Sequence, residues 1–266
     1  MSKHDHDRGL AHDLELLTRR RMLWFLGGAA LVPVIAGCTQ IDGGAGADAS
    51  SGSGSDSTGT CATIPQETAG PYPGDGTNGA NALTLTGIVR SDITTSLTSS
   101  KVAAGIPLTV TLAIVKGSSC EPAVGYAVYI WHCDRDGNYS MYSSGVTGDS
   151  YLRGIQVTDA NGQVTFTTIW PACYSGRWPH IHFEVYPSLA EATSGTNKVS
   201  VSQLAMPNAQ CDEVFATTGY SQSVTNLGQI SLATDMVFAD GATRETPAVT
   251  GSTATGYIAT LNVPIG

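Results

Sequence analysis

Basic residues are scarce in this sequence. Only 13 Lys and Arg stand against 22 Asp and Glu in 266 residues. Residues 1–37 carry five of the basic and four of the acidic residues, which leaves 8 against 18 from Cys38 onwards. A domain with this balance is a poor candidate for binding nucleic acid, whose phosphates reward a basic face. It is also a poor candidate for adhering to anionic lipid without a covalent anchor.

Long apolar runs and CxxC motifs are also missing. Beyond residue 37 no apolar stretch reaches the roughly 20 residues that a membrane-spanning helix needs. The six cysteines include no CxxC pair, which disfavours a cysteine-ligated metal site. No internal repeat is evident, and the roughly 205 residues after the N-terminal region suffice for one domain with a sizeable core.

The N-terminal residues are typical of an export signal. TRRRML, residues 18–23, precedes the apolar run WFLGGAALVPVIAG and resembles a twin-arginine signal. The run ends in IAGC, residues 35–38, which resembles a bacterial lipobox with Cys38 as the lipidated residue. We therefore expect an exported protein at the cell surface or in the periplasm, in contact with the membrane only through the lipid on Cys38.

A flexible tether separates this signal from the domain. GGAGADASSGSGSDSTG, residues 43–59, is rich in Gly, Ser, Ala and Asp, a composition typical of flexible linkers. The sequence thus predicts a signal at residues 1–37, a tether at 38–60 and a catalytic domain at 61–266.

Export permits disulfides, and five cysteines follow Cys38. Their odd number leaves at least one thiol unpaired, and sequence alone does not determine the pairing. We expect Cys61 to pair with Cys120 and Cys173 with Cys211, which leaves Cys133 free.

The domain is predicted to be an all-β antiparallel sandwich with little helix. Six runs are rich in β-branched and aromatic residues, several with period two: 82–90, 106–115, 125–134, 163–170, 180–186 and 257–263. The DANG segment at 159–162 contains an Asn-Gly pair, a strong hairpin signal. The best candidate for a short helix is DEVFAT at 212–217. Strands separated by Gly/Ser/Asn-rich turns favour a single β-sandwich domain.

Two histidines stand one residue apart in an otherwise histidine-poor domain. In RWPHIHFEVY, residues 177–186, a β-strand would direct His180 and His182 to one face and Ile181 and Phe183 to the other. A strand of this kind offers two imidazoles to one metal ion. His132, beside Trp131, is expected to be structural instead.

Further motifs surround the histidine strand. They are WHCDRDGNYSMY at 131–142, with Tyr139 after a turn-like DRDGN, the segment 152–183 with Tyr174, and ETAGPYP at 67–73. Together these motifs resemble the intradiol ring-cleavage dioxygenases, the family that includes protocatechuate and catechol dioxygenases. The resemblance covers most of residues 61–266 and is densest at 124–184.

The resemblance implies a non-haem Fe(III) site held by Tyr139, Tyr174, His180 and His182. Two anionic phenolates favour Fe(III), and the imidazoles complete the set while leaving room for another ligand. By the same resemblance Tyr174 would leave the iron when substrate binds and act as a base. Arg177 would stabilise negative charge on the ring, and Gln203, a looser match, would lie near the oxygen site. The implied reaction inserts both atoms of O2 between the two hydroxylated carbons of a catechol and gives a cis,cis-muconate-type diacid.

The substrate implied is a small aromatic diol together with O2. Only SGRWP, residues 175–179, separates Tyr174 from His180, which resembles the exported members of the family and predicts an open pocket. A domain with few basic residues offers no clear partner for a carboxylated ring beyond Arg177. We therefore expect small catechols rather than protocatechuate. The sequence leaves the oligomeric state open, a homodimer included.

Two alternatives remain at this stage. His180, His182 and Glu184 lie on one strand face and could form an Fe(II) facial triad or a zinc hydrolase site. The domain could also be a non-catalytic surface-binding module of the β-sandwich type.

Overall fold

The computed structural model describes residues 61–266. The predicted signal at 1–37, the predicted tether at 38–60 and the predicted lipidation site at Cys38 lie outside the described residues. Within 61–266, no helix has both the length and the hydropathy to cross a membrane.

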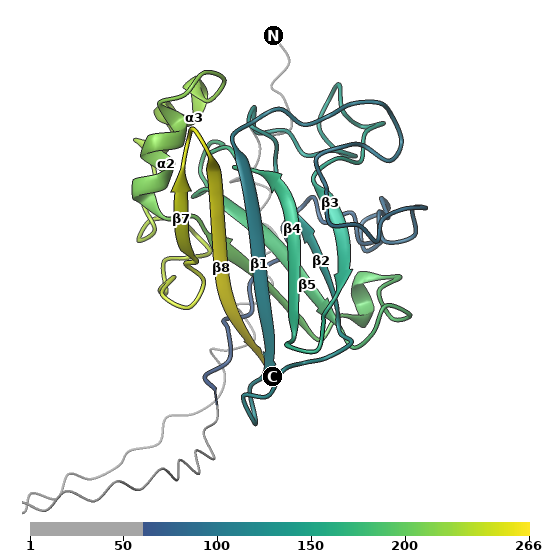
Figure 1. The fold of residues 1–266 in the computed structure, drawn as a ribbon. Helices are drawn as coiled ribbons and strands as arrows, with labels where there is room; N and C mark the ends of the chain where they lie inside the picture. The colour runs from purple at the N-terminus through teal and green to yellow at the C-terminus, as the bar shows by residue number, and fades with distance from the viewer. Residues whose placement is uncertain (1–60) are drawn as a thin grey trace, which may run out of the picture.

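Two four-stranded sheets pack face to face (Figure 1). The first sheet has the order β4 (Gln163–Ile169), β1 (Pro107–Lys116), β8 (Gly256–Ile265), β7 (Ala248–Ser252). The second has the order β3 (Arg153–Val157), β2 (Ala127–Trp131), β5 (His180–Tyr186), β6 (Ser200–Ala205). The predicted β-sandwich is confirmed, and its strand pairs are antiparallel except for β1 and β8, which run parallel.

The main core lies between the sheets. Alternate residues of each strand point inward, as the period of two predicts. The core includes Val110, Leu112 and Ile114 of β1, Val128 and Ile130 of β2, Phe166 of β4, and Ile181, Phe183 and Val185 of β5.

Strands β2 and β5 are buried on both faces. Their outer face packs against a second cluster formed by loops, including Tyr72, Leu83, Tyr139 and Tyr174. This loop layer covers the sheet face from which His180 and His182 project. The two histidines are therefore held in a closed interior and not on a surface.

Helices are few, as predicted. The structure describes α2 (Asn208–Phe215), α3 (Ser221–Leu227) and the 3-10 turn η2 (Gly195–Asn197). The first of these overlaps the helix expected at 212–217 but begins four residues earlier, while α3 was not expected. Both helices lie beside the β7 end of the sandwich in Figure 1.

Two local predictions were wrong. The run 82–90 is not a strand but part of the covering loop layer, with turns at Leu85 and Ile88 and a single bridge from Val89 to Ile155. Its apolar residues pack on the outer face of the sheet, which explains the alternation without a strand ladder. The DANG segment does form a turn, in which Gly162 has φ +73°, but it passes from β3 to β4 in the other sheet and closes no hairpin.

Of the cysteine predictions, two are confirmed and one is wrong. The disulfide between Cys61 and Cys120 is present, and Cys133 is free, as expected. The pairing of Cys173 with Cys211 is wrong, because both are free and buried. Their thiols donate to different backbone carbonyls, those of Arg177 and Met206.

Candidate metal centre

Strand β5 places His180 and His182 side by side on the outer face of its sheet. Their Nε2 atoms lie 3.1 Å apart. The ring of His182 stacks on Trp131, its cross-strand neighbour in β2, with centroids 4.8 Å apart and planes within 3°. Trp131 therefore fixes the orientation of this imidazole.

A turn after β2 delivers Tyr139 to the same place. Asp134 accepts hydrogen bonds from the N–H groups of Asp136 and Asn138, and Gly137 takes φ +86°, which favours glycine. The predicted DRDGN turn is thus confirmed. It orients Tyr139 inward, where its hydroxyl lies 3.3 Å from His180 Nε2.

The loop after β4 supplies Tyr174. Helix α3 holds this loop through the backbone of Cys173, whose N–H donates to Ser223 and whose carbonyl accepts from Asn226. The Tyr174 hydroxyl lies 3.4 Å from His180 Nε2. A tight turn then leads to the histidine strand, since Arg177 N–H donates to the Tyr174 carbonyl.

Four polar atoms consequently converge on one point. The hydroxyls of Tyr139 and Tyr174 and Nε2 of His182 each lie 3.1 to 3.4 Å from His180 Nε2. A metal bonded at about 2.1 Å to each donor holds neighbouring donors roughly 3 Å apart. The predicted ligand set is therefore assembled in space with the separations that a shared metal ion requires.

The protonation states of these groups also suit a metal. Burial, followed by the charge of Arg177, lowers the pKa of His180 to about 3, and burial lowers the pKa of His182 well below its usual value. Both imidazoles are therefore neutral, the form that binds metals. Burial and the neighbouring Tyr174 raise the pKa of Tyr139, so that ionising its phenol here needs a nearby cation. Two neutral nitrogens and two phenols fit a ferric ion.

Arg177 and Gln203 lie beside this cluster, as the sequence predicts. Gln203 is the cross-strand partner of His182 on β6, and its Oε1 accepts from Arg177 at 2.8 Å. Arg177 also pairs with Asp235, from Nε to Oδ2 at 3.0 Å. Sequence analysis missed Asp235, which stands in a loop without a motif.

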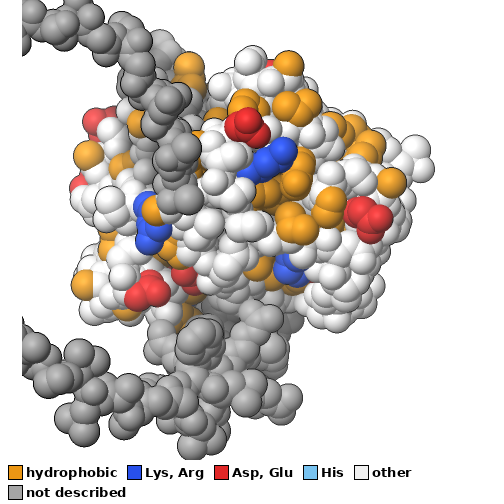
Figure 2. All heavy atoms as spheres, turned by 90° about the horizontal axis from the view of Figure 1, so that it is seen from below, with side chains coloured by type: hydrophobic (Ala, Val, Ile, Leu, Met, Phe, Trp, Pro, Cys, Tyr) orange, Lys and Arg blue, Asp and Glu red, His pale blue; other side chains and the backbone are white. Residues whose placement is uncertain are grey.

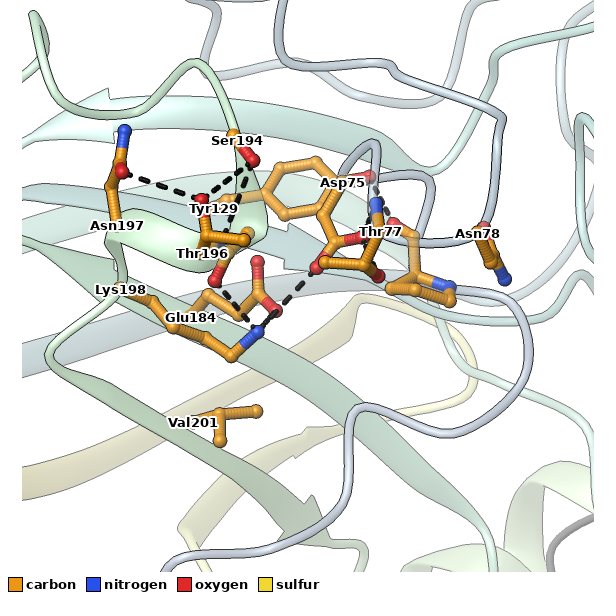
Figure 3. A network of polar contacts seen from close by, with 12 residues as sticks. Asp75, Thr77, Asn78, Tyr129, Glu184, Ser194, Thr196, Asn197, Lys198 and Val201 are labelled. Atoms are coloured by element: carbon orange, nitrogen blue, oxygen red, sulfur yellow. Dashed lines mark hydrogen bonds and ion pairs between the residues drawn. The ribbon is translucent and has the colours of Figure 1, made fainter. Parts of the chain in front are cut away.

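Glu184 does not join the metal ligands. Its carboxylate pairs with Lys198 at 3.0 Å and accepts from the Tyr186 hydroxyl, and Figure 3 shows it in a network with Lys198 and Asp75. Within residues 61–266, no group of three or more His, Cys, Asp or Glu side chains could hold a metal ion. The facial-triad alternative with His180, His182 and Glu184 is therefore wrong, because the carboxylate is already committed to a buried ion pair.

The ETAGPYP segment forms part of the wall. The ring centroids of Tyr72 and Tyr139 lie 5.0 Å apart. Gly70 packs against His182, and a Cβ added at Gly70 would lie 3.4 Å from the imidazole ring. Buried Arg153 anchors this segment by donating to the carbonyls of Tyr72 and Pro73, and it also donates to the Ser140 carbonyl. Arg153 thus joins the segment to the Tyr139 loop, a role that sequence analysis missed.

His132 is structural, as expected. Its ring nitrogens contact the Cys133 carbonyl and the Thr168 hydroxyl, both at 2.7 Å. Because both ring nitrogens are hydrogen-bonded, His132 has no nitrogen left to bind a metal ion.

A cavity of about 190 Å³ borders Tyr174. It is lined by the oppositely charged Arg135 and Asp136 of the DRDGN turn and by Gln222 of α3. Charged side chains of both signs are likewise scattered over the face in Figure 2, which shows no continuous basic surface.

Comparison with known sequences identifies proteins that are similar to this chain. Residues 88–184 match a family model described as dioxygenase, and this range contains all four residues of the candidate cluster. The chain is 35% identical over 60 residues to chlorocatechol 1,2-dioxygenase of Rhodococcus opacus. That match spans 23% of this chain and 23% of the relative's length.

Solved structures share the fold over a longer range. An intradiol ring-cleavage dioxygenase from Tetranychus urticae superposes with a TM-score of 0.61 at 26% identity. The superposition covers 77% of this chain and 95% of that chain. A crystal structure of another dioxygenase gives the same TM-score and coverage at 27% identity.

Proposed function

Because the chain belongs to the intradiol ring-cleavage dioxygenase family, we propose that it uses non-haem Fe(III) to cleave catechol-type rings between the two hydroxylated carbons. The products would be cis,cis-muconate-type diacids. The observation that carries this proposal is the convergence of Tyr139, Tyr174 and His182 on His180 Nε2.

The residues that would hold the iron are Tyr139, Tyr174, His180 and His182. Bound there, ferric iron would ionise the phenols and supply a Lewis acid for both oxygens of a catechol. The His180 tautomer suits this role: its Nδ1 lies 2.5 Å from the Trp178 carbonyl, which can only accept, so Nδ1 carries the proton. The Nε2 lone pair therefore faces the cluster.

The surrounding residues have separate tasks in the proposed reaction. Tyr174, which borders the cavity, would take a catechol proton on its phenol oxygen. Arg177 would stabilise negative charge that develops on the ring, since its guanidinium is buried where a fixed charge acts strongly. Gln203 would hold that guanidinium in place. The loop layer over β5 leaves His180 and His182 each 2% exposed, which would limit the access of water to the iron.

We propose small uncarboxylated catechols as substrates. Arg135 and Asp136, which line the cavity beside Tyr174, carry opposite charges, and Arg177 is already paired with Asp235. This arrangement supports a neutral ring better than an anionic one. Comparing O2 uptake on catechol, hydroxyquinol and protocatechuate tests the proposal, which fails if only the carboxylated ring reacts.

The visible spectrum of the iron-loaded protein is the decisive experiment. A tyrosinate-to-iron charge-transfer band that moves to longer wavelength on anaerobic addition of catechol is the expected result. A colourless protein that binds iron or zinc in stoichiometric amount would overturn the proposal. Bound iron with the band but no O2 uptake on any catechol would instead favour a non-catalytic binding module.

We also propose that the enzyme acts outside the cytoplasmic membrane on a lipid anchor at Cys38. The Cys61–Cys120 disulfide supports this location, because such bonds persist in oxidising compartments. Labelling cells with a radioactive fatty acid tests the anchor, and a Cys38→Ala variant should lose both the label and membrane association.

A further inference from the structure

Asp235 is a fully buried carboxylate. One of its oxygens accepts hydrogen bonds from the segment that precedes His180, and the other accepts them from its own loop. Its Oδ2 accepts from Arg177 Nε at 3.0 Å and from the Trp178 N–H at 2.7 Å. Its Oδ1 accepts from the N–H groups of Val237 and Phe238. The carboxylate thus joins the 235–238 turn to the RWPH segment at a point without solvent.

The first consequence concerns Arg177. Nε is held by Asp235 and one terminal nitrogen by Gln203 Oε1 at 2.8 Å, so two acceptors on different elements determine the plane of the guanidinium. Because the guanidinium is planar, hydrogen bonds to two fixed acceptors determine its orientation. Although burial raises the pKa of Asp235, Arg177 and the N–H donors hold it below its usual value, so the carboxylate remains charged.

The second consequence concerns His180. Asp235 accepts the N–H of Trp178, and the carbonyl of the same residue accepts the Nδ1 proton of His180. Trp178 is further held by its indole N–H, which donates to the Met206 carbonyl. Asp235 therefore holds the residue whose carbonyl selects the His180 tautomer. Hydrogen bonds of this kind, one step beyond the ligands, orient metal ligands and tune their affinity.

We propose that Asp235 is a positioning residue that sets both the guanidinium of Arg177 and the metal-binding tautomer of His180. The inference rests on the proposed function: its metal-binding part requires that the cluster binds iron, and its catalytic part requires in addition that the protein cleaves catechols. A single loop carboxylate would then couple the charge that faces the substrate to the ligand that faces the iron.

Asp235→Asn tests this directly. The amide has one oxygen, so either Arg177 and Trp178 or the Val237 and Phe238 N–H groups must face an NH2 group. We expect ferric iron affinity, measured by chelator competition, to fall roughly 10- to 100-fold, and kcat per bound iron with catechol to fall by a similar factor. Asp235→Glu, which keeps the charge and both acceptors, should recover part of each loss.

Asp149→Asn is the matched control, because Asp149 is also buried and paired, with Ser99 and Lys101, away from the ligands. It should change neither quantity. Folded Asp235→Asn with wild-type iron affinity and wild-type kcat overturns the inference. If Asp235→Asn does not fold, Asp235→Glu decides: unchanged affinity together with unchanged kcat again overturns it. Wild type that binds iron but consumes no O2 would refute the proposed function, while the affinity comparison still judges Asp235.

Discussion

His182 and Gln203 are direct partners across the β5–β6 ladder, so the amide of Gln203 lies on the same sheet face as the two imidazoles. The amide is held at both ends, since Oε1 accepts from Arg177 and Nε2 donates to the Thr68 carbonyl. Gln203 therefore links the histidine strand, Arg177 and the ETAGPYP segment.

Replacing Gln203 with Leu should impair turnover but not metal binding. The variant removes one hydrogen bond to a charged group, and we expect kcat/KM with catechol to fall about tenfold, close to 1.4 kcal/mol. Iron content should stay at the wild-type level, since Gln203 is not a ligand. Gln66→Leu is a suitable control, because Gln66 is exposed and bonds to Ser200 and Val201 instead. Equal activity of the two variants would contradict the role given to Gln203.

The two tyrosines should each be needed for the iron chromophore. We expect Tyr139→Phe and Tyr174→Phe to lose iron, to change the energy of any remaining charge-transfer band, and to abolish O2 uptake. The physical reason is that each variant removes one of the two anionic ligands proposed here, which favour Fe(III). Tyr126→Phe, a half-buried tyrosine outside the cluster, should leave the spectrum unchanged. An unaltered spectrum in Tyr174→Phe would exclude that tyrosine as a ligand.

Lys198 compensates two buried carboxylates. It lies 3.0 Å from Glu184 and 3.5 Å from Asp75, which have no exposed surface (Figure 3). Lys198→Met should therefore lower the free energy of unfolding by about 3 kcal/mol, measured by urea denaturation. Lys116→Met on the exposed end of β1 should change it by less than about 0.5 kcal/mol.

A variant at Glu184 separates stability from metal binding. Because Glu184 is engaged with Lys198 and Tyr186, Glu184→Gln should keep its iron. Loss of iron in that variant, with the fold intact, would return Glu184 to the list of ligands.

The Cys61–Cys120 disulfide should contribute to stability. It closes a loop with a sequence separation of 59 residues. Replacing both cysteines with Ser should lower the free energy of unfolding by about 2–4 kcal/mol. Thiol titration of the unfolded, unreduced domain (residues 61–266) should find the three free cysteines at 133, 173 and 211. A fourth or fifth reactive thiol would contradict the pairing.

Local rules explain part of the candidate cluster, whereas the family resemblance supplied Tyr139 and Tyr174 as candidates. Strand alternation places His180 and His182 on one face, and the Asp and Gly of DRDGN specify the turn that presents Tyr139. Both rules act within a few residues, so neither needs knowledge of the tertiary fold.

The supporting residues were not predictable for the opposite reason. Asp235 and Lys198 stand in loops and meet their partners only through chain folding, with no periodic signal. Edge strands β3, β6 and β7 were missed because they are short and contain polar residues or glycine. The alternation at 82–90 reflects packing on a sheet face and not membership of the sheet, a distinction that periodicity does not make.

Two acidic side chains should make stability depend on pH. Burial, Glu245 and Asp240 raise the pKa of Glu67 to about 8, and burial with Asp240 raises the pKa of Glu245 to about 7. A carboxyl whose pKa is raised on folding binds its proton more tightly in the native state. The stability it contributes is therefore fully present below about pH 4.5, the unfolded value, and is lost as the pH rises through 7 to 8.

Urea denaturation at several pH values between 5 and 9 measures this loss. Glu67→Gln and Glu245→Gln cannot ionise at these positions, so each should show a smaller decline in the free energy of unfolding than wild type over that interval. Glu121→Gln on the surface should follow the wild-type curve, which separates the effect of Glu67 and Glu245 from the general effect of negative charge. A decline in Glu67→Gln as steep as in wild type would mean that this carboxyl is already ionised near neutral pH, and that Arg177 outweighs its burial.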